Sequence, residues 1–184
     1  KGVSNNANSN NTGVGKDALK AITTGGDNVA VGTNAGNSLT TGVQNTFLGR
    51  SAGQGITTQN NNTYLGFNSG LNQTGTGNVA VGNHTMKFAS GDANYSVAVG
   101  GSALYSITTG DNNIAVGTSA SESLTTGSSN TIIGYQASYN NQTGSNNVAI
   151  GKESLKGSSG NSTSTNVAVG FETLKALSSG HTNV

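Results

Sequence analysis

The chain contains no cysteine, no proline, few charged residues and no long apolar run. The absence of cysteine excludes disulfides and thiolate metal sites and is compatible with an extracellular location. Without proline, nothing in the sequence interrupts an extended strand. Eight basic and seven acidic residues give a net charge of +1, which creates no field to steer nucleic acid or a membrane surface. The longest apolar stretches span only a few residues, so we expect no transmembrane segment, no membrane insertion and no signal peptide.

Composition alone would suggest disorder, because only 32% of the residues are hydrophobic. However, the chain also lacks the high net charge that usually accompanies disorder, and it is strongly repetitive. A pentad such as Asn28-Val29-Ala30-Val31-Gly32 occurs ten times and begins an eleventh time at Asn183-Val184. We number positions from the closing glycine of each pentad, which is position 0. These glycines, most of them 17 residues apart, are Gly15, Gly32, Gly49, Gly66, Gly82, Gly100, Gly117, Gly134, Gly151 and Gly170. A regular period of this length indicates a repeat protein whose units stack into one core.

Two positions of the pentad carry a regular apolar pattern. Position −3 is always β-branched and position −1 is always aliphatic. The two positions are two residues apart, so they share one side of an extended strand, and β-branched residues favour strands over helices. We therefore predict that position −1 faces the core, and that the alanine common at position −2 lies on the opposite side, where chains could approach closely. The predicted core residues at position −1 are Val31, Val81, Val99, Val116, Ile133, Ile150 and Val169.

The rest of each unit is polar with a small residue at position +3 and, in many units, an aliphatic residue at position +7. Thr-Thr-Gly or a similar turn sequence usually follows, as at residues 23–25 and 125–127. Each unit thus reads as a strand, a turn, a second short strand and a turn. We predict an all-β parallel β-solenoid of ten coils of ~17 residues, without helices. Residues 1–10 form a lead-in or the end of a preceding coil, and residues 11–184 form one array that stops at the start of an eleventh repeat.

Asparagine occupies position −4 in nine of the ten pentads, with Ser96 in the other. A side-chain amide repeated at one position of stacked coils can form a hydrogen-bonded ladder along the axis. Alternatively, each side chain can bond to its own turn. Both interpretations give the column a structural role.

No motif in the chain is typical of catalysis or of cofactor binding. His84 and His181 lie in different units without a neighbouring carboxylate cluster, as ordinary surface histidines do. Glu153 and Glu172 share position +2 of successive units. Lys152, Lys156 and Lys175 are close in sequence, so we expect a solvated charge cluster there and no paired-carboxylate active site. We expect no enzyme activity, no metal and no cofactor.

The repeats resemble two families of fibrous proteins. Ser96-Val97-Ala98-Val99-Gly100-Gly101-Ser102-Ala103 is similar to the head repeats of trimeric autotransporter adhesins. The longer unit, with residues 45–53 or 135–144, resembles more closely the repeats of tail-fibre-like proteins of phages, large viruses and some bacteria. The resemblance covers almost the whole chain from Asn11. It implies a homotrimer of solenoids, and the units here are longer than the compact adhesin repeat.

From this resemblance we expect a structural fibre segment on a virion surface or otherwise outside the cell. It would serve as the shaft or head of a viral tail fibre and project a surface that binds a host glycan or protein receptor. The head of a bacterial trimeric adhesin is an alternative, and a polysaccharide-degrading tailspike or an ice-binding solenoid with threonine pairs is a more distant one. Nucleic acid is not an expected partner. Candidate surface-binding aromatics, which could instead pack between coils or chains, are Tyr64, Phe67, Phe88, Tyr105, Tyr135 and Tyr139.

Overall fold

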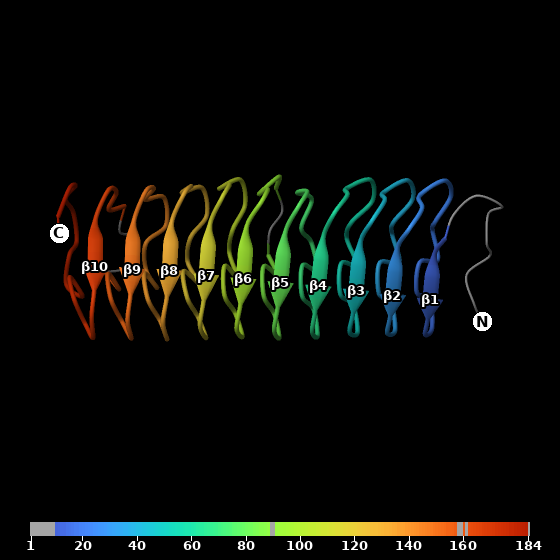
Figure 1. The fold of residues 1–184 in the computed structure, drawn as a ribbon, viewed down its shortest axis with the longest axis horizontal. Helices are drawn as coiled ribbons and strands as arrows, with labels where there is room; N and C mark the ends of the chain where they lie inside the picture. Colours follow the sequence, from blue (N-terminus) through green and yellow to red (C-terminus); the bar gives the residue numbers. More distant parts are fainter. Residues whose placement is uncertain (1–9, 89–90, 158–159, 161, 184) are drawn as a thin grey trace.

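Ten three-residue strands, one in each repeat, form a single parallel sheet (Figure 1). The structure is a computed structural model that describes residues 10–88, 91–157, 160 and 162–183, and these residues contain no helix. We call the coil that contains strand βn coil n. The strands are β1 (Thr12–Val14), β2 (Val29–Val31), β3 (Thr46–Leu48), β4 (Thr63–Leu65), β5 (Val79–Val81), β6 (Val97–Val99), β7 (Ile114–Val116), β8 (Thr131–Ile133), β9 (Val148–Ile150) and β10 (Val167–Val169). The predicted all-β parallel solenoid with a spacing of ~17 residues is confirmed.

Equivalent residues of successive coils stack directly on one another. Each strand pairs only with the strands before and after it in sequence, in a register that matches Ala98 with Ala115 and Val99 with Val116. The backbone is bonded in both directions along the axis: Gly117 N–H donates to the Val99 carbonyl of the preceding coil at 2.7 Å, and Val97 N–H donates to the Asn113 carbonyl of the following coil at 2.8 Å. The coils therefore form an elongated array with β1 and β10 at opposite ends (Figure 1).

The interior is lined by the middle residue of each strand, at position −2. Ala30, Phe47 and Ala115 are fully buried, whereas the residues on either side of them in the strands are exposed or half-buried. The prediction that position −1 faces the core is therefore wrong for the single chain, as is the prediction that alanine lies outside. The misassigned residues, all exposed or half-buried, are Val31, Val81, Val99, Val116, Ile133, Ile150 and Val169.

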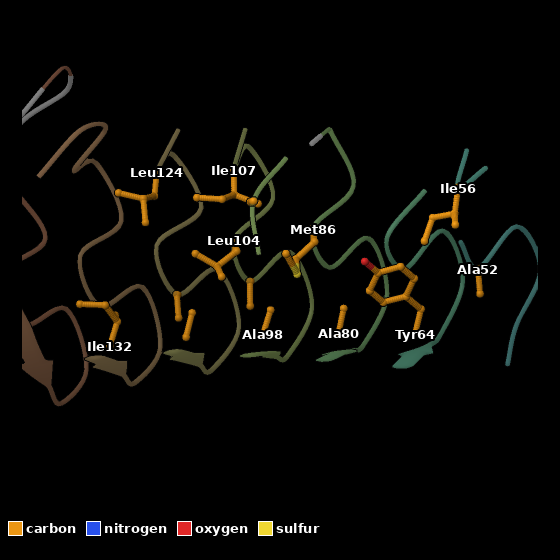
Figure 2. Close-up of a cluster of buried hydrophobic side chains, with 14 of the residues drawn as sticks. Ala52, Ile56, Tyr64, Ala80, Met86, Ala98, Leu104, Ile107, Leu124 and Ile132 are labelled. Atoms are coloured by element: carbon orange, nitrogen blue, oxygen red, sulfur yellow. The ribbon is translucent and has the colours of Figure 1, made fainter. Parts of the chain in front are cut away.

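The physical reason is the narrowness of the coil. A three-residue strand turns only one side chain to one of its faces and two to the other, because successive side chains alternate. Since positions +3, +4 and +7 fill the interior from the facing walls, the strand contributes only its middle residue. In Figure 2, Ala98 points inward from the strand, and Leu104 and Ile107 approach it from the rest of the coil.

Side-chain volumes at positions −2 and +4 compensate for each other. Where position −2 is alanine, as at Ala98, position +4 can be large, as at Leu104. Where position −2 is aromatic, position +4 is glycine: a Cβ at Gly53 would lie 2.6 Å from the ring of Phe47, and a Cβ at Gly70 would lie 2.4 Å from the ring of Tyr64. Both rings therefore fit inside a coil of unchanged size, where they stack with their centroids 5.7 Å apart. The pairing also extends between coils, because a Cβ at Gly36 of coil 2 would lie 2.6 Å from the ring of Phe47 in coil 3, so the core is packed by matched choices within and between neighbouring coils.

Left-handed backbone conformations recur in every coil. The residue at position +2, as at Ser102, and the one at position +4, as at Leu104, have positive φ angles. Such a conformation costs roughly 1–2 kcal/mol for a residue with a side chain. It turns successive N–H groups toward opposite neighbours, because Ser102 donates to Asn83 of the preceding coil and Leu104 to Ala120 of the following coil. The stacking bonds offset the cost.

The pentad glycine is required by the close approach of two coils. At Gly117, with φ +133°, a Cβ would lie 2.6 Å from the carbonyl oxygen of Gly134 in the next coil. Any other residue would push the two coils apart, which explains why this position never varies among the repeats.

The expected second strand of each coil does not form in the described residues. In the Thr-Thr-Gly segment, the N–H groups of Thr23, Thr24 and Gly25 all converge on the carbonyl of Thr40. A strand would instead distribute these bonds over alternate residues of its neighbour. The threonine hydroxyl adds a further bond between coils, as Thr40 Oγ1 donates to the Thr57 carbonyl at 2.9 Å. The segment therefore stacks as a turn.

The asparagine ladder is present. Asn45 Nδ2 donates to Asn28 Oδ1 at 3.0 Å, and the same oxygen accepts the Asn45 backbone N–H at 2.9 Å. The second amide hydrogen of each residue serves a backbone carbonyl, as in the bond from Asn28 Nδ2 to Gly42 O at 2.8 Å. These amides are buried, so the ladder satisfies polar groups that would otherwise destabilise the interior. Ser96 continues the backbone part of the ladder, and Asn183 extends it beyond coil 10.

The effects of substitutions at Phe47 and Gly53 on the free energy of unfolding should be strongly non-additive, because the two residues pack against each other. Gly53→Leu should overpack against Phe47 and cost about 1–3 kcal/mol, while Phe47→Ala should leave a cavity and cost about 3–5 kcal/mol. The double variant recreates the Ala98 and Leu104 pair, so its loss should be smaller than that of Phe47→Ala alone. Urea unfolding of the three variants measures this, and additive losses would contradict compensation.

The ladder predicts an unusual pH dependence for Asn130→Asp. Asn130 donates to Asn113 Oδ1 and to the Gly144 carbonyl, and a carboxylate cannot make either bond. Burial and the lost donors raise the pKa of the introduced carboxyl in the folded state above its unfolded value of about 3.9. Its folded state therefore binds more protons, and the variant should be least stable near neutral pH and recover as the pH falls toward about 4. Asn112→Asp, at the exposed position next to the ladder residue Asn113, is the control. If the stability of both variants is independent of pH, the ladder does not have this role.

Candidate functional site

The structure separates the predicted surface aromatics into two groups. Tyr64 is wrong as a surface residue: it is fully buried, its hydroxyl donates to Asn62 Oδ1 at 3.2 Å, and burial raises the pKa of its phenol. It fills the middle position of β4, where Figure 2 shows its ring inside the coil. Phe67, Phe88 and Tyr135 are exposed, and Tyr105 and Tyr139 are half-buried. Sequence reasoning missed two exposed rings, Tyr95 and Phe171.

The remaining predicted aromatics share one part of the coil, the six residues that follow the pentad glycine. We call the surface formed by positions +1 to +6 of all coils the turn edge. It comprises residues 16–21, 33–38, 50–55, 67–72, 83–88, 101–106, 118–123, 135–140, 152–157 and 171–176. Because each segment starts just after a strand ends, the turn edge runs along the carboxyl ends of the strands for the full length of the array.

The basic residues are confined to this edge. Of the eight, Lys1 lies outside the described residues, and the other seven all occupy position +1 or position +5. They are Lys16, Lys20, Arg50, Lys87, Lys152, Lys156 and Lys175. Among the exposed aromatics, only Tyr95 lies elsewhere, at position −5. Cations and exposed rings are thus gathered on one longitudinal surface, which a sequence without its repeat register does not reveal.

Cation and ring contacts group on the turn edge in the middle of the array. Arg50 lies over Phe67 at 5.7 Å, and the Phe67 ring lies 5.3 Å from the ring of His84. One coil further, Lys87 lies over Phe88 at 4.9 Å, and Phe88 meets Tyr105 edge to face at 4.8 Å. Desolvation and the nearby Lys87 lower the pKa of His84, so its imidazole is neutral at physiological pH.

Coils 8 to 10 carry the densest part of the turn edge. Lys152 Nζ lies 6.0 Å from the centre of the Tyr135 ring and 5.6 Å from that of Phe171, so it stands between two exposed rings. At position +5 of the neighbouring coils, Lys156 lies over Tyr139 at 5.8 Å. Position +1 thus presents a ring, a cation and a ring in three successive coils.

A lysine-bridged ion cluster lies next to these rings. Lys175 Nζ is 2.6 Å from Glu153 Oε2 and 2.8 Å from Glu172 Oε1, and Lys156 is 3.6 Å from Glu153. The hydrogen bond from Lys175 lowers the pKa of Glu153, and the two carboxylates in turn raise the pKa of Lys175. A carboxyl held as an anion in this way is poorly suited to donate a proton in catalysis. Its solvent exposure makes the cluster a weak contributor to stability.

The histidines do not gather with other ligand types. Within the described residues, no group of three or more histidine, aspartate or glutamate side chains could hold a metal ion. His181 is exposed, and its backbone forms an isolated parallel β-bridge with Ser164 in the preceding coil. Among the same residues, no helix has the length and hydrophobicity to span a bilayer.

The outward face of the sheet is the second notable surface. Nine of the fourteen large hydrophobic side chains that are exposed lie at positions −3 and −1 of the strands, and the other five are aromatic. Ile133 is 39% exposed and Val169 is 61% exposed. An apolar stripe that follows the whole array is far larger than the scattered exposed residues of an ordinary surface.

Comparison with protein families, with characterised proteins and with solved structures finds no match to this chain. The functional argument therefore depends on the two surfaces themselves.

The contact between Tyr139 and Glu122 can be tested by titration. The phenol lies 3.3 Å from Glu122 Oε1, and the charge of this carboxylate is the main cause that raises the pKa of Tyr139. Glu122→Gln should therefore lower this pKa toward the ordinary value of 10.0. NMR titration of ring-labelled tyrosine measures the shift. Asp17→Asn, far away in coil 1, should leave it unchanged, and an unaltered Tyr139 in Glu122→Gln would show that the two groups do not interact in solution.

Proposed function

We propose that this chain is a structural segment of a fibre, most similar in role to the shaft or head of a viral tail fibre, and that it works as a parallel homotrimer. The observation that carries the proposal is the uncovered aliphatic stripe at positions −3 and −1. Exposing this stripe to water is unfavourable at about 25 cal/mol per Å² of apolar surface. A chain that persists in water is expected to cover it.

A further copy of the same chain is the partner that suits the stripe. The stripe repeats once per coil, at the strand spacing of about 4.8 Å, over ten coils in unbroken register. A partner must present apolar groups with the same period over the same length. Another copy, aligned in parallel, meets this requirement through every coil at once. The number three comes from the resemblance of the repeats to trimeric fibres.

The elongated shape of the array supports a role in projecting a binding surface rather than a role in catalysis. Ten coils at the strand spacing give a rod of about 50 Å. The carboxylates of Glu153 and Glu172 both form ion pairs with Lys175. The chain would therefore hold a binding surface outward from a virion, with no catalytic step of its own and no cofactor, and bind a host receptor through exposed turns.

Breaking the stripe should dissociate the assembly. Val116→Asp and Ile133→Asp together place two carboxylates in the proposed interface without entering the interior of the coil. Sedimentation equilibrium should report three copies of the 18.2-kDa chain for the unmodified protein and a smaller species for the double variant. Thr126→Asp, at an exposed site of coil 7 away from the stripe, should remain assembled.

Two results would contradict the proposal. One is an unmodified chain that remains a folded monomer at micromolar concentration. The other is an oligomer that the double variant forms equally well, which would place the interface elsewhere. Small-angle scattering adds the length of the particle, which should match one array of about 50 Å rather than several arrays end to end.

A further inference from the structure

The turn edge of coils 8 to 10 combines features that a structural role in the solenoid does not require. The rings of Tyr135 and Phe171 are 48% and 67% exposed, so burial of apolar surface does not explain them. They occupy position +1, which is a small or uncharged polar residue in four other coils (Thr33, Asn83, Gly101 and Thr118), a cation in Lys16 and Arg50, and a third exposed ring in Phe67. The fold therefore tolerates simple residues at this position, and the rings are additions to it.

Lys152 is the distinctive cation of this surface. Lys156 and Lys175 are each within 4.0 Å of a carboxylate, whereas Lys152 makes no such ion pair with the carboxylates of the described residues. It stands instead between Tyr135 and Phe171, which are two coils, or about 10 Å, apart along the axis. The result is a ring, a cation that makes no direct ion pair, and a second ring in three successive coils, with the charge of Lys152 also helping to lower the pKa of the Glu153 carboxyl.

We propose that this surface, Tyr135, Lys152 and Phe171, binds a polysaccharide that carries carboxylate groups, such as one containing uronic acids. The proposal rests on the fibre function above and names the class of receptor. Aromatic faces pack against the apolar faces of sugar rings, and an ammonium group pairs with a sugar carboxylate. The carboxylates of Glu153 and Glu172 beside this surface can accept hydrogen bonds from sugar hydroxyls.

The spacing favours an extended chain over a single sugar. The three side chains come from three successive coils, and the pitch of the coils is close to the length of one sugar residue in an extended polysaccharide. A polysaccharide laid along the axis would therefore meet ring, cation and ring with successive units. In sequence, position +1 is separated from position −1 of the aliphatic stripe only by the pentad glycine.

Charge argues against nucleic acid as the occupant. Binding a phosphate backbone depends on several cations that displace counterions. Here Glu153 and Glu172 offset the charges of two of the three lysines, which leaves one uncompensated positive charge. A single available ammonium fits a polymer with intermittent carboxylates better than one with a charge on every unit.

Isothermal titration with defined polymers tests the proposal. The probes are hyaluronate, which alternates uronic acid with a neutral sugar, uncharged dextran, and the polyanion oligo(dT). The unmodified protein should bind hyaluronate and not dextran. Lys152→Gln should weaken binding by up to about fivefold, the upper end of the range for an exposed ion pair. Tyr135→Ala with Phe171→Ala should weaken it by about tenfold or more.

Matched controls separate the site from general surface effects. Tyr95→Ala removes a ring that is 66% exposed at a different position of the coil, and Lys20→Gln removes an exposed cation from coil 1. Both should bind hyaluronate like the unmodified protein, and thermal melts should show all variants folded. The melts identify any variant that loses affinity because it is unfolded. Lys152→Gln changes an exposed residue and should remain folded, so it tests the site even if the double ring variant unfolds.

Several outcomes would overturn the proposal: no binding of hyaluronate at millimolar sugar concentration, equal binding of dextran, tighter binding of oligo(dT), or equal losses in the control variants. Sedimentation of the same samples keeps the two proposals distinguishable. A trimer that binds no hyaluronate would leave the fibre function standing and remove the glycan site. A monomer that binds it would do the reverse.

Discussion

Hydrogen bonds between equivalent residues of successive coils are the interaction on which the whole structure depends. Each coil is too thin to enclose a core alone, so many of its backbone groups and interior side chains find their partners in the coils before and after it. This requirement explains the glycine at position 0, where coils approach most closely, and the left-handed residues at positions +2 and +4. It also explains why the length of a coil varies so little, since an extra residue in a stacked segment would break the register.

The architecture followed from the sequence because the period is a property of the whole chain, and the asparagine ladder was one of the two arrangements that the repeated amide allowed. Which face of each strand points toward the core could not be predicted from the sequence pattern. Position −1 is aliphatic in every coil and position −3 is β-branched, with threonine in four of the ten coils, but position −2 is apolar as well, and alternation alone does not say which side encloses the core. A signal was nevertheless present: Phe47 and Tyr64 occur with Gly53 and Gly70, whereas Ala98 occurs with Leu104. Paired volume changes of this kind mark residues that touch inside a core.

The candidate site shows the same limit. Residue type alone suggests that exposed aromatic side chains take part in recognition. Whether a ring is exposed, however, depends on its position within the coil. Tyr64 and Tyr135 differ by three places in the repeat, and this difference puts one inside and the other on the turn edge. The confinement of the basic residues to positions +1 and +5 could have been read from the register alone. The contacts of these basic side chains with rings and carboxylates of neighbouring coils could be identified only from the structure.

The asparagine ladder also gives the rod an electrical direction. The side-chain carbonyls of Asn28, Asn113, Asn130 and Asn147 all accept from the following coil, so they all point toward the C-terminal end. The axial backbone bonds run both ways and largely cancel, whereas these amide dipoles add. The N-terminal side of any coil therefore carries partial positive charge at its core and the C-terminal side partial negative charge. An end-to-end contact between two such arrays would therefore be favoured by these dipoles when it is head to tail and disfavoured when it is head to head.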